Sequence, residues 1–390
     1  MPTYTPVARL LVAGIVSALL SGVAWASPPI LLFDIGNWWG YSSSLALLPN
    51  GLPAVASDGY GERYAWFDGG TWQATVVESG SCRGAGLAIL PSGRPALAYV
   101  KTATDELRYS EFDGSAWHCT TVLSGVEIYD SPVLAVLPDG TPVMVYVEQA
   151  SHQLVYACRD GTSWQHTVVD AGSSCRPSLF VLPSGAPAVA YSSGGRVRYA
   201  WLEEGVWQTS DVADIGADYV SLALGPSGQP AIAHSIWWNT YQLSYAEFNG
   251  ATWTDSLVAA GGWACALGFN AGGDPVIGHM DPEANMLKCS WRVDGLWLTT
   301  ELDSCWTYML GMVRLTSGHL LLSYNAEWPE RLRLAAICGA PQTLYVNPTA
   351  GNDLWDGLAG EWDGTHGPKA TIGTAMGQAW HLDEVVLAPG

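Results

Sequence analysis

The sequence predicts an all-β fold in which seven four-stranded blades form a ring, a β-propeller. One glycine-centred phrase returns seven times at intervals of 42 to 47 residues, and a period of this length made of short strands is typical of propellers. No repeat sustains a 3.6-residue hydrophobic period, and 44 glycines and 23 prolines interrupt the chain. The marker glycines are Gly51, Gly93, Gly140, Gly185, Gly228, Gly273 and Gly318.

Each repeat predicts the same order of strands. In the third repeat, residues 132–137 and 142–147 form two apolar strands, and residues 154–159 and 165–170 form two more. Pro-x-Gly and Asp-Gly turns separate them, because glycine and proline supply the backbone angles that tight turns need. A tryptophan follows the second turn in six repeats, and we interpret it as structural because every blade uses it. These residues are Trp72, Trp117, Trp164, Trp207, Trp253 and Trp297.

The two ends of the repeat array predict how the ring closes. The seventh repeat has no fourth strand after residues 332–338, whereas residues 29–35 form a spare strand before the first repeat. Insertion of the spare strand into the last blade would leave no open sheet edge. We therefore expect the propeller to span residues 27–340, closed by its N-terminal strand.

Residues 1–26 predict a signal peptide, with Arg9, an apolar run over residues 10–23 and the cleavage site Ala24-Trp25-Ala26. A membrane anchor is the alternative, but the run is short for a span. We expect a secreted or cell-surface (periplasmic or extracellular) protein with no membrane span after cleavage. The eight cysteines would face an oxidising compartment, so disulfides or buried thiols are expected without a defined pairing.

The last segment, residues 341–390, departs from the repeats. It reads Leu-Tyr-Val-Asn-Pro at 344–348, Gly-Pro-Lys-Ala-Thr-Ile at 367–372 and Val-Val-Leu-Ala-Pro-Gly at 385–390. This text resembles the opening of right-handed parallel β-helix (pectate-lyase-like) domains of secreted bacterial proteins. The resemblance implies a first strand, a short helix over residues 371–380 and a strand at 384–387. Because one coil cannot bury a solenoid core, we expect a truncated β-helix domain; a small cap on the propeller is the alternative.

The repeats themselves resemble those of secreted bacterial propellers. The shared phrases are Ser-Leu-Ala-x-x-Pro-x-Gly-x-Pro and Leu-x-Tyr-x-x-x-Asp-Gly-x-x-Trp, and they are similar in appearance to lectin and sialidase-type propellers. The resemblance covers residues 29–340 and implies the fold. The sialidase box separates its Asp and Gly by one residue, whereas Asp68 and Gly69 are adjacent. No catalytic residue is therefore carried over.

Charge and motifs exclude several classes of function. The formal net charge of −20 repels phosphate backbones, so we expect no nucleic-acid partner. Serine-hydrolase, zinc-protease and P-loop motifs are absent from the sequence. Arg83 and Arg176 follow cysteines in matching loops but fall short of a sialidase-like arginine cluster. His234 and His279 are better interpreted as structural than as metal ligands. We expect no metal, no cofactor and a monomer.

The candidate ligand-binding residues lie in the irregular loops. Because neighbouring strands are antiparallel, the regular turns share one face and the variable loops share the other, where function is usually found. Aromatic rings there could stack on sugars while acid and amide groups accept hydroxyl hydrogen bonds; packing between blades or over the channel mouth is the alternative. The candidates are Trp38, Trp39, Tyr129, Asp130, Trp237, Trp238, Asn239, Tyr241, Trp263, Trp306, Tyr308 and Trp328. The loop of Trp237, Trp238 and Asn239 is favoured, because two adjacent tryptophans are hard to bury together.

These observations favour a non-catalytic recognition module that binds a glycan or another cell-surface ligand. One alternative is the N-terminal part of a polysaccharide lyase or hydrolase whose active site lies in a missing β-helix. Paired carboxylates for glycoside hydrolysis also stay open, since Asp58, Asp130, Asp218 and Glu327 could share a face. A third alternative is a structural or adhesive propeller that binds protein.

Overall fold

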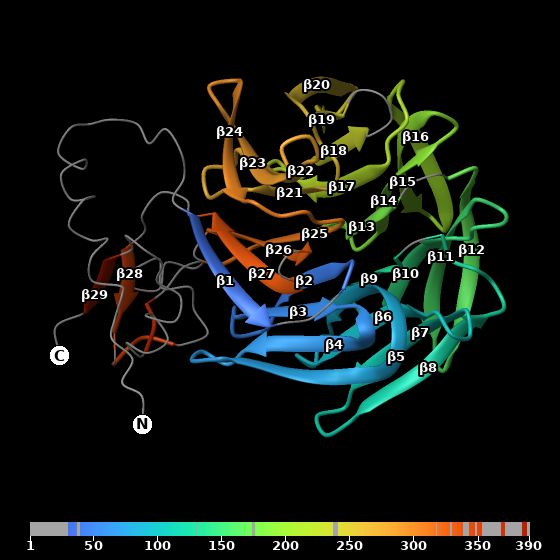
Figure 1. The fold of residues 1–390 in the computed structure, drawn as a ribbon, viewed down its shortest axis with the longest axis horizontal. Helices are drawn as coiled ribbons and strands as arrows, with labels where there is room; N and C mark the ends of the chain where they lie inside the picture. Colours follow the sequence, from blue (N-terminus) through green and yellow to red (C-terminus); the bar gives the residue numbers. More distant parts are fainter. Residues whose placement is uncertain are drawn as a thin grey trace.

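Sheets arranged around a common axis make up the fold (Figure 1). The structure, a computed structural model, describes residues 30–36, 40–129, 131–173, 176–236, 241–316, 318–327, 330–337, 343–347, 349–352, 368–370 and 384–387. Every regular element in these ranges is a strand, which confirms the predicted all-β class. No helix in the described part is long and apolar enough to cross a membrane.

Four repeats form separate four-stranded antiparallel sheets with consecutive strand order. The first is β9 (Val133–Val136), β10 (Pro142–Val147), β11 (Gln153–Asp160) and β12 (Ser163–Ala171). The second is β13 (Ser178–Val181), β14 (Pro187–Ser193), β15 (Arg196–Glu203) and β16 (Val206–Ala213). The third is β17 (Tyr219–Leu224), β18 (Pro230–Ile236), β19 (Gln242–Phe248) and β20 (Trp253–Ala260). The fourth is β21 (Cys265–Phe269), β22 (Pro275–Asp281), β23 (Met286–Val293) and β24 (Leu296–Asp303).

The last repeat forms a fifth four-stranded sheet that includes the N-terminal strand. It consists of β25 (Leu310–Arg314), β26 (Leu320–Glu327), β27 (Glu330–Ile337) and β1 (Ile30–Gly36). Strand β1 pairs antiparallel with β27, so that Ile30 lies opposite Ile337. Arg331 and Arg333 of β27 donate hydrogen bonds of 2.6 and 2.8 Å to the Asp34 carboxylate of β1. The predicted closure by the N-terminal strand is confirmed.

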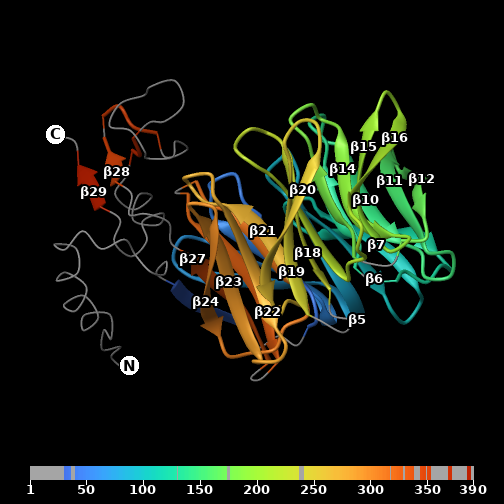
Figure 2. The ribbon, with the colours of Figure 1, turned by 90° about the horizontal axis from the view of Figure 1, so that it is seen from above.

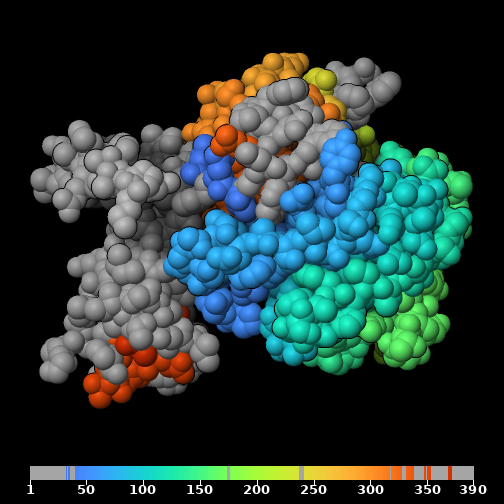
Figure 3. Space-filling model, turned by 60° about the horizontal axis from the view of Figure 1, so that its bottom comes forward, coloured from blue at the N-terminus to red at the C-terminus, as the bar shows by residue number. Residues whose placement is uncertain are grey.

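The first two repeats share one seven-stranded sheet, so the prediction of seven separate four-stranded blades is wrong. The sheet comprises β2 (Ser43–Leu47), β3 (Pro53–Ser57), β4 (Gly59–Phe67), β5 (Trp72–Ile89), β6 (Pro95–Lys101), β7 (Glu106–Phe112) and β8 (Trp117–Ser124). The physical reason lies in β5, which is 18 residues long and pairs with β4 in its first part and with β6 in its second part. Cys82 pairs with Gly59 on one side and with Lys101 on the other. Figure 3 shows this sheet, blue to cyan, as one continuous side of the molecule.

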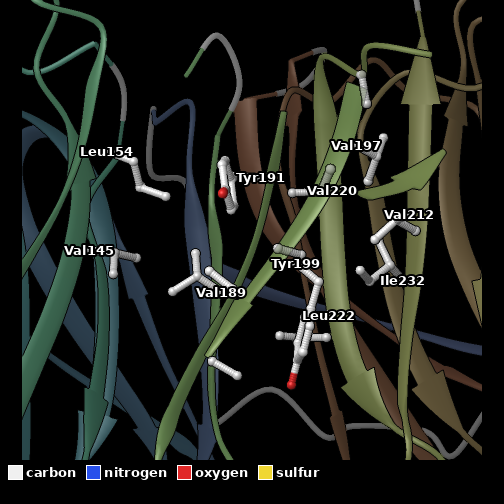
Figure 4. Close-up of a cluster of buried hydrophobic side chains, with 14 of the residues drawn as sticks. Val145, Leu154, Val189, Tyr191, Val197, Tyr199, Val212, Val220, Leu222 and Ile232 are labelled. Atoms are coloured by element: carbon white, nitrogen blue, oxygen red, sulfur yellow. The ribbon is translucent and has the colours of Figure 1, made fainter. Parts of the chain in front are cut away.

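Hydrophobic layers between neighbouring sheets form the core (Figure 4). The second strand of each sheet is covered on both sides, and every residue of β10 and β14 is buried. Such strands read as continuous apolar runs rather than alternating ones. Val145, Val189 and Ile232 come from three successive sheets of one core layer and are fully buried.

Five of the six recurring tryptophans tie their blade to the preceding repeat, which supports their structural interpretation. In five interfaces the tryptophan meets a third-strand tyrosine of the repeat before it, edge to face, with ring centroids 5.3 to 5.5 Å apart. Aromatic pairs prefer this arrangement. The pairs are Tyr64–Trp117, Tyr109–Trp164, Tyr156–Trp207, Tyr199–Trp253 and Tyr245–Trp297.

A second tie joins a fourth-strand carboxylate to the next repeat. Glu78 accepts hydrogen bonds from the Tyr99 hydroxyl at 2.6 Å, Lys101 Nζ at 2.5 Å and Arg108 Nε at 3.2 Å. Two of the three contacts of this Glu78 tripod, from a tyrosine and an arginine, recur at two other interfaces: Asp170 with Tyr191 and Arg198, and Asp303 with Tyr324 and Arg333. The buried second-strand tyrosines Tyr99, Tyr191 and Tyr324 are therefore part of the interfaces between blades.

We expect Glu78→Ala to destabilise the protein by about 2–4 kcal/mol. The substitution leaves the charges of Lys101 and Arg108 in the interface without their carboxylate partner. Urea denaturation followed by circular dichroism measures the change. Glu111→Ala is the matched control: its partner is Arg159 at 2.9 Å, and both side chains are about a third exposed, so its loss should cost about 1 kcal/mol or less. Equal losses in the two variants would contradict a special role for the tripod.

The C-terminal segment contains two short strands. Strands β28 (Thr343–Val346) and β29 (Glu384–Leu387) pair in parallel, with Thr343 opposite Glu384, and lie outside the ring of sheets (Figure 2). Both strands match the prediction. The predicted helix over residues 371–380 and the signal peptide lie outside the described residues, and one parallel pair does not establish a β-helix.

The six described cysteines are free thiols, so the expected disulfides are not formed among them. Cys82, Cys265, Cys289 and Cys305 are buried, which agrees with the alternative of buried thiols. Each packs inside a blade interface; the Cys265 sulfur, for example, lies 3.6 Å from the Ala233 carbonyl oxygen. Burial raises the pKa of each of these four thiols to about 12.

Candidate functional site

The strand order separates the molecule into two faces. The turns that follow the first and third strands of a blade, such as those at Gly140 and Gly161, lie on what we call the turn face. The loops between second and third strands and the segments between blades lie on the opposite side, the loop face. The marker glycine is needed at its turn because its backbone is left-handed, with φ of 89° at Gly140.

A cavity of about 310 Å³ lies at the centre of the ring, lined by the innermost strands β2, β5, β9, β13, β17, β21 and β25. Its wall is mostly small and apolar. Three of the five serine hydroxyls in the wall accept hydrogen bonds from the backbone of the neighbouring inner strand: Ser44 from Leu87 at 3.1 Å, Ser178 from Leu222 at 3.0 Å, and Ser221 from Leu267 at 2.9 Å. These polar groups therefore stabilise the ring and leave few partners for a ligand inside the cavity.

Five aromatic rings meet at the loop-face end of this cavity, and we call them the mouth cluster: Tyr41, Tyr219, Trp263, Trp306 and Tyr308. The Trp263 ring lies 5.2 Å from Trp306, 6.0 Å from Tyr308 and 6.2 Å from Tyr219, measured between centroids. Tyr41 lies 5.6 Å from Tyr308. Three of these four contacts are edge to face and the fourth is tilted. Tyr41 is 48% exposed, and the other four rings are partly buried.

Arg176 connects the mouth cluster across the ring. Its guanidinium carbon lies 4.9 Å above the Tyr219 ring, and its Nη1 donates a hydrogen bond of 3.2 Å to the Tyr308 carbonyl. Arg176 precedes β13 and Tyr308 precedes β25, so the contact joins two well-separated blades. Ser131 makes a similar connection, since its hydroxyl lies 3.4 Å from the Met309 sulfur. The cluster is thereby a cover over the channel with one cation in it.

Three hydrogen bonds fix Trp263, the central ring of the cluster, in place. The Trp263 amide donates to the Met280 carbonyl at 2.8 Å, its carbonyl accepts from the Ser235 hydroxyl, and its indole Nε1 donates to the Tyr219 hydroxyl. The site can therefore offer preformed ring faces, phenol hydroxyls and one guanidinium to a ligand.

Asp58 holds the backbone of Tyr41 at the mouth. Its carboxylate accepts backbone hydrogen bonds from Tyr41 at 2.7 Å, Ser42 at 2.9 Å and Gly84 at 2.9 Å. Burial raises the pKa of Asp58 in spite of these donors. These three contacts join the segment before β2 to β5.

The two histidines of interest also have partners within their own blades. His234 Nε2 lies 2.9 Å from the Asp255 carboxylate, and His279 Nε2 lies 3.0 Å from the Ser290 hydroxyl. Burial lowers the pKa of His279 to about 4. These contacts support the structural interpretation of both residues.

The structure brings together three of the predicted ligand-binding residues, Trp263, Trp306 and Tyr308. Tyr129, which is 42% exposed, and Tyr241 lie in other loops, and no ring contact joins either to the mouth cluster within the described part of the chain. The remaining candidates lie outside the described residues: Trp38, Trp39, Asp130, Trp237, Trp238, Asn239 and Trp328.

The candidate set omitted Tyr41, Tyr219 and Arg176. Both tyrosines lie shortly before or at the first strand of a blade, as Trp263 and Trp306 do, and this shared position places them among the aromatic residues of the irregular segments. Arg176 has the same place after a cysteine as Arg83, whose Nη2 donates to the Ile128 carbonyl at 2.5 Å. The Arg83 contact joins β5 to the segment before the next sheet, whereas the Arg176 contact reaches the segment before β25, in a distant blade.

Comparison with known proteins supports the fold alone. No family model and no curated protein matches the chain. A PL25 ulvan lyase bound to -[GlcA(1-4)Rha3S]- is 12% identical, with a TM-score of 0.55 over 78% of this chain and 95% of that one. A second structure of a PL25 ulvan lyase gives a TM-score of 0.54 at 12% identity over the same shares of the two chains. The polysaccharide lyase Uly1 is 11% identical, with a TM-score of 0.52 over 77% of this chain and 90% of that one.

Proposed function

We propose that this chain binds a polysaccharide at the loop face, through the mouth cluster. The observation that carries the proposal is the convergence of Tyr41, Tyr219, Trp263, Trp306 and Tyr308 at one end of the central cavity. Partly exposed rings stack on the apolar faces of sugars, and their hydroxyl and N–H groups provide hydrogen bonds. The fold shared with polysaccharide lyases supports a glycan as the ligand. Export through the predicted signal peptide and a monomeric state belong to the same proposal.

A second candidate function is cleavage of a polysaccharide that contains uronic acid. The observation that favours it is the placement of the Arg176 guanidinium 4.9 Å above the Tyr219 ring. An elimination reaction needs a cation near the uronate carboxylate and a base near the C5 proton, and these two side chains could fill those roles. Incubation with polyuronates, followed by the ultraviolet absorbance of unsaturated products, tests this candidate. Product formed by the wild type and lost in Arg176→Gln would favour cleavage over binding alone.

We expect Trp306→Ala to weaken glycan binding about tenfold, because it removes one stacking ring worth roughly 1–2 kcal/mol. A glycan array identifies a ligand, and titration calorimetry then compares the dissociation constants. Trp297→Ala is the matched control: it removes a recurring tryptophan of the turn face, so it should lower the melting temperature and leave the affinity unchanged.

The opposite pattern would overturn the proposal. If Trp306→Ala melts early and keeps full affinity, the mouth cluster is only a packed cover. The predicted loop of Trp237, Trp238 and Asn239 is tested in the same titration with Trp237→Ala.

A further inference from the structure

A groove on the turn face lies between the β13–β16 sheet and the β17–β20 sheet. Its volume is about 630 Å³, and its walls include Tyr199, Trp201, Phe248 and Trp253, with Ser184 and Gln229 at the exposed rim. This size is typical of sites for small molecules. The groove lies on the face opposite the mouth cluster, so the polysaccharide site proposed above does not account for it.

The aromatic walls are held in a fixed arrangement. Trp201 stacks on Tyr199 with centroids 5.6 Å apart and planes 24° apart. Trp253 meets Tyr199 at 5.5 Å and Phe248 at 5.3 Å, and its Nε1 donates to the Ser210 hydroxyl at 3.2 Å. Trp201, Phe248 and Trp253 are each only partly buried. The site is therefore preformed, with ring surface available to a ligand.

In the next interface, between the β17–β20 and β21–β24 sheets, a charged pair occupies the position that corresponds to the groove. There Glu247 and Arg292 occupy the places of Trp201 and Phe248 in the repeat. Arg292 donates hydrogen bonds of 3.2 and 3.0 Å to Glu247, and its guanidinium lies 5.2 Å above the Tyr245 ring. Glu111 and Arg159 do the same at another interface, 5.1 Å above Tyr109. A charged pair thus covers the tyrosine in these interfaces, whereas the Trp201–Phe248 interface leaves a groove.

We propose that this groove binds an uncharged aromatic small molecule, of the indole or phenol type. Its described lining contains no charged residue, so an ionised ligand would lose water without gaining a partner. Its walls are mainly apolar and aromatic, so a sugar would leave most hydroxyl groups unsatisfied. An aromatic ring gains stacked and edge-to-face contacts with Trp201, Phe248 and Trp253. Ser184 and Gln229 at the rim can then hydrogen-bond the single hydroxyl or N–H of such a ligand.

The chain itself supplies the test variant. The double substitution Trp201→Glu with Phe248→Arg copies the charged pair of Glu247 and Arg292 into the groove. Titration calorimetry with indole should show binding to the wild type and a loss of at least tenfold in the double variant. The melting temperature should be retained, because the pair already exists in the neighbouring interface. Glycan binding at the loop face should be unchanged, which separates this proposal from the one above.

A second variant keeps the test decisive if the double variant does not fold. Ala251→Trp places a large ring in the groove from an exposed turn, and it should reduce indole binding to the same extent. Trp66→Glu with Phe112→Arg is the control for the introduced charges: it changes the corresponding rings of the first two repeats and should leave indole binding at the Trp201 groove in place. No indole binding to the wild type, equal binding to the groove variants, or tighter binding of methyl glucoside than of indole would each overturn the proposal.

Discussion

Deletion of residues 30–36 should lower the melting temperature by on the order of 10 °C or more, because it opens the ring. Strand β1 supplies the ladder partners of β27 from Ile337 to Leu332. Without β1, the edge of β27 is uncovered, and the buried side chains of Leu332 and Leu334 lose the neighbouring strand that protects them. Differential scanning calorimetry measures the change in melting temperature.

Removal of residues 343–390 is the matched control for this deletion. The segment contains the separate β28–β29 pair, so its loss should leave the main transition of the propeller in place. Equal effects of the two deletions would contradict a specific role for β1, and unfolding after the second deletion alone would make the C-terminal segment an integral cap.

Replacement of Glu62 by glutamine should stabilise the protein increasingly as pH rises. Glu62 is fully buried, and neither carboxyl oxygen has a hydrogen-bond partner in the described structure. Burial, together with the nearby carboxyl groups of Asp58 and Glu78, raises the pKa of Glu62 well above its ordinary value of 4.5. The folded protein therefore holds a proton on Glu62 that the unfolded chain releases.

The sign of the pH dependence follows from this difference. The stability that the protonated Glu62 contributes is fully present below its ordinary pKa and is lost as pH rises through the raised one. Glutamine stays neutral at every pH. The melting temperatures of wild type and Glu62→Gln, plotted against pH, should therefore coincide in acid and separate above the ordinary pKa of glutamate. Thermal melts across pH measure the effect, and Glu203→Gln, at an exposed position, is the control. A constant offset between wild type and Glu62→Gln would refute the argument.

The repeat spacing predicted most of the fold because its causes are local. The glycine at Gly140 has the left-handed backbone that its turn requires, and Trp164 makes the same tyrosine contact as four other repeat tryptophans. The continuity of β5 could not be predicted in this way. It depends on Cys82 finding partners on both sides, and a ladder register is a property of three strands together.

The candidate site was predicted only in part for a similar reason. Trp263, Trp306 and Tyr308 were identifiable as aromatic residues in irregular segments before blades. The contact between Arg176 and the Tyr308 carbonyl depends on how the ring curves back on itself, which no local pattern encodes. The groove beside Trp201 could be recognised only by comparison with the next interface, where the Glu247–Arg292 pair occupies the corresponding position.

The pairing of β1 with β27 also sets the order of folding. Ile30 and Ile337 are partners, although they lie at opposite ends of the propeller sequence. Hairpins such as β10–β11 need only short loops to close, whereas this ladder must close almost the whole chain, and contacts of large sequence separation form slowly. We therefore expect the last blade to be completed after the others. Until then the edge of β27 is an open template for a strand from another molecule, so refolding yield should fall as protein concentration rises.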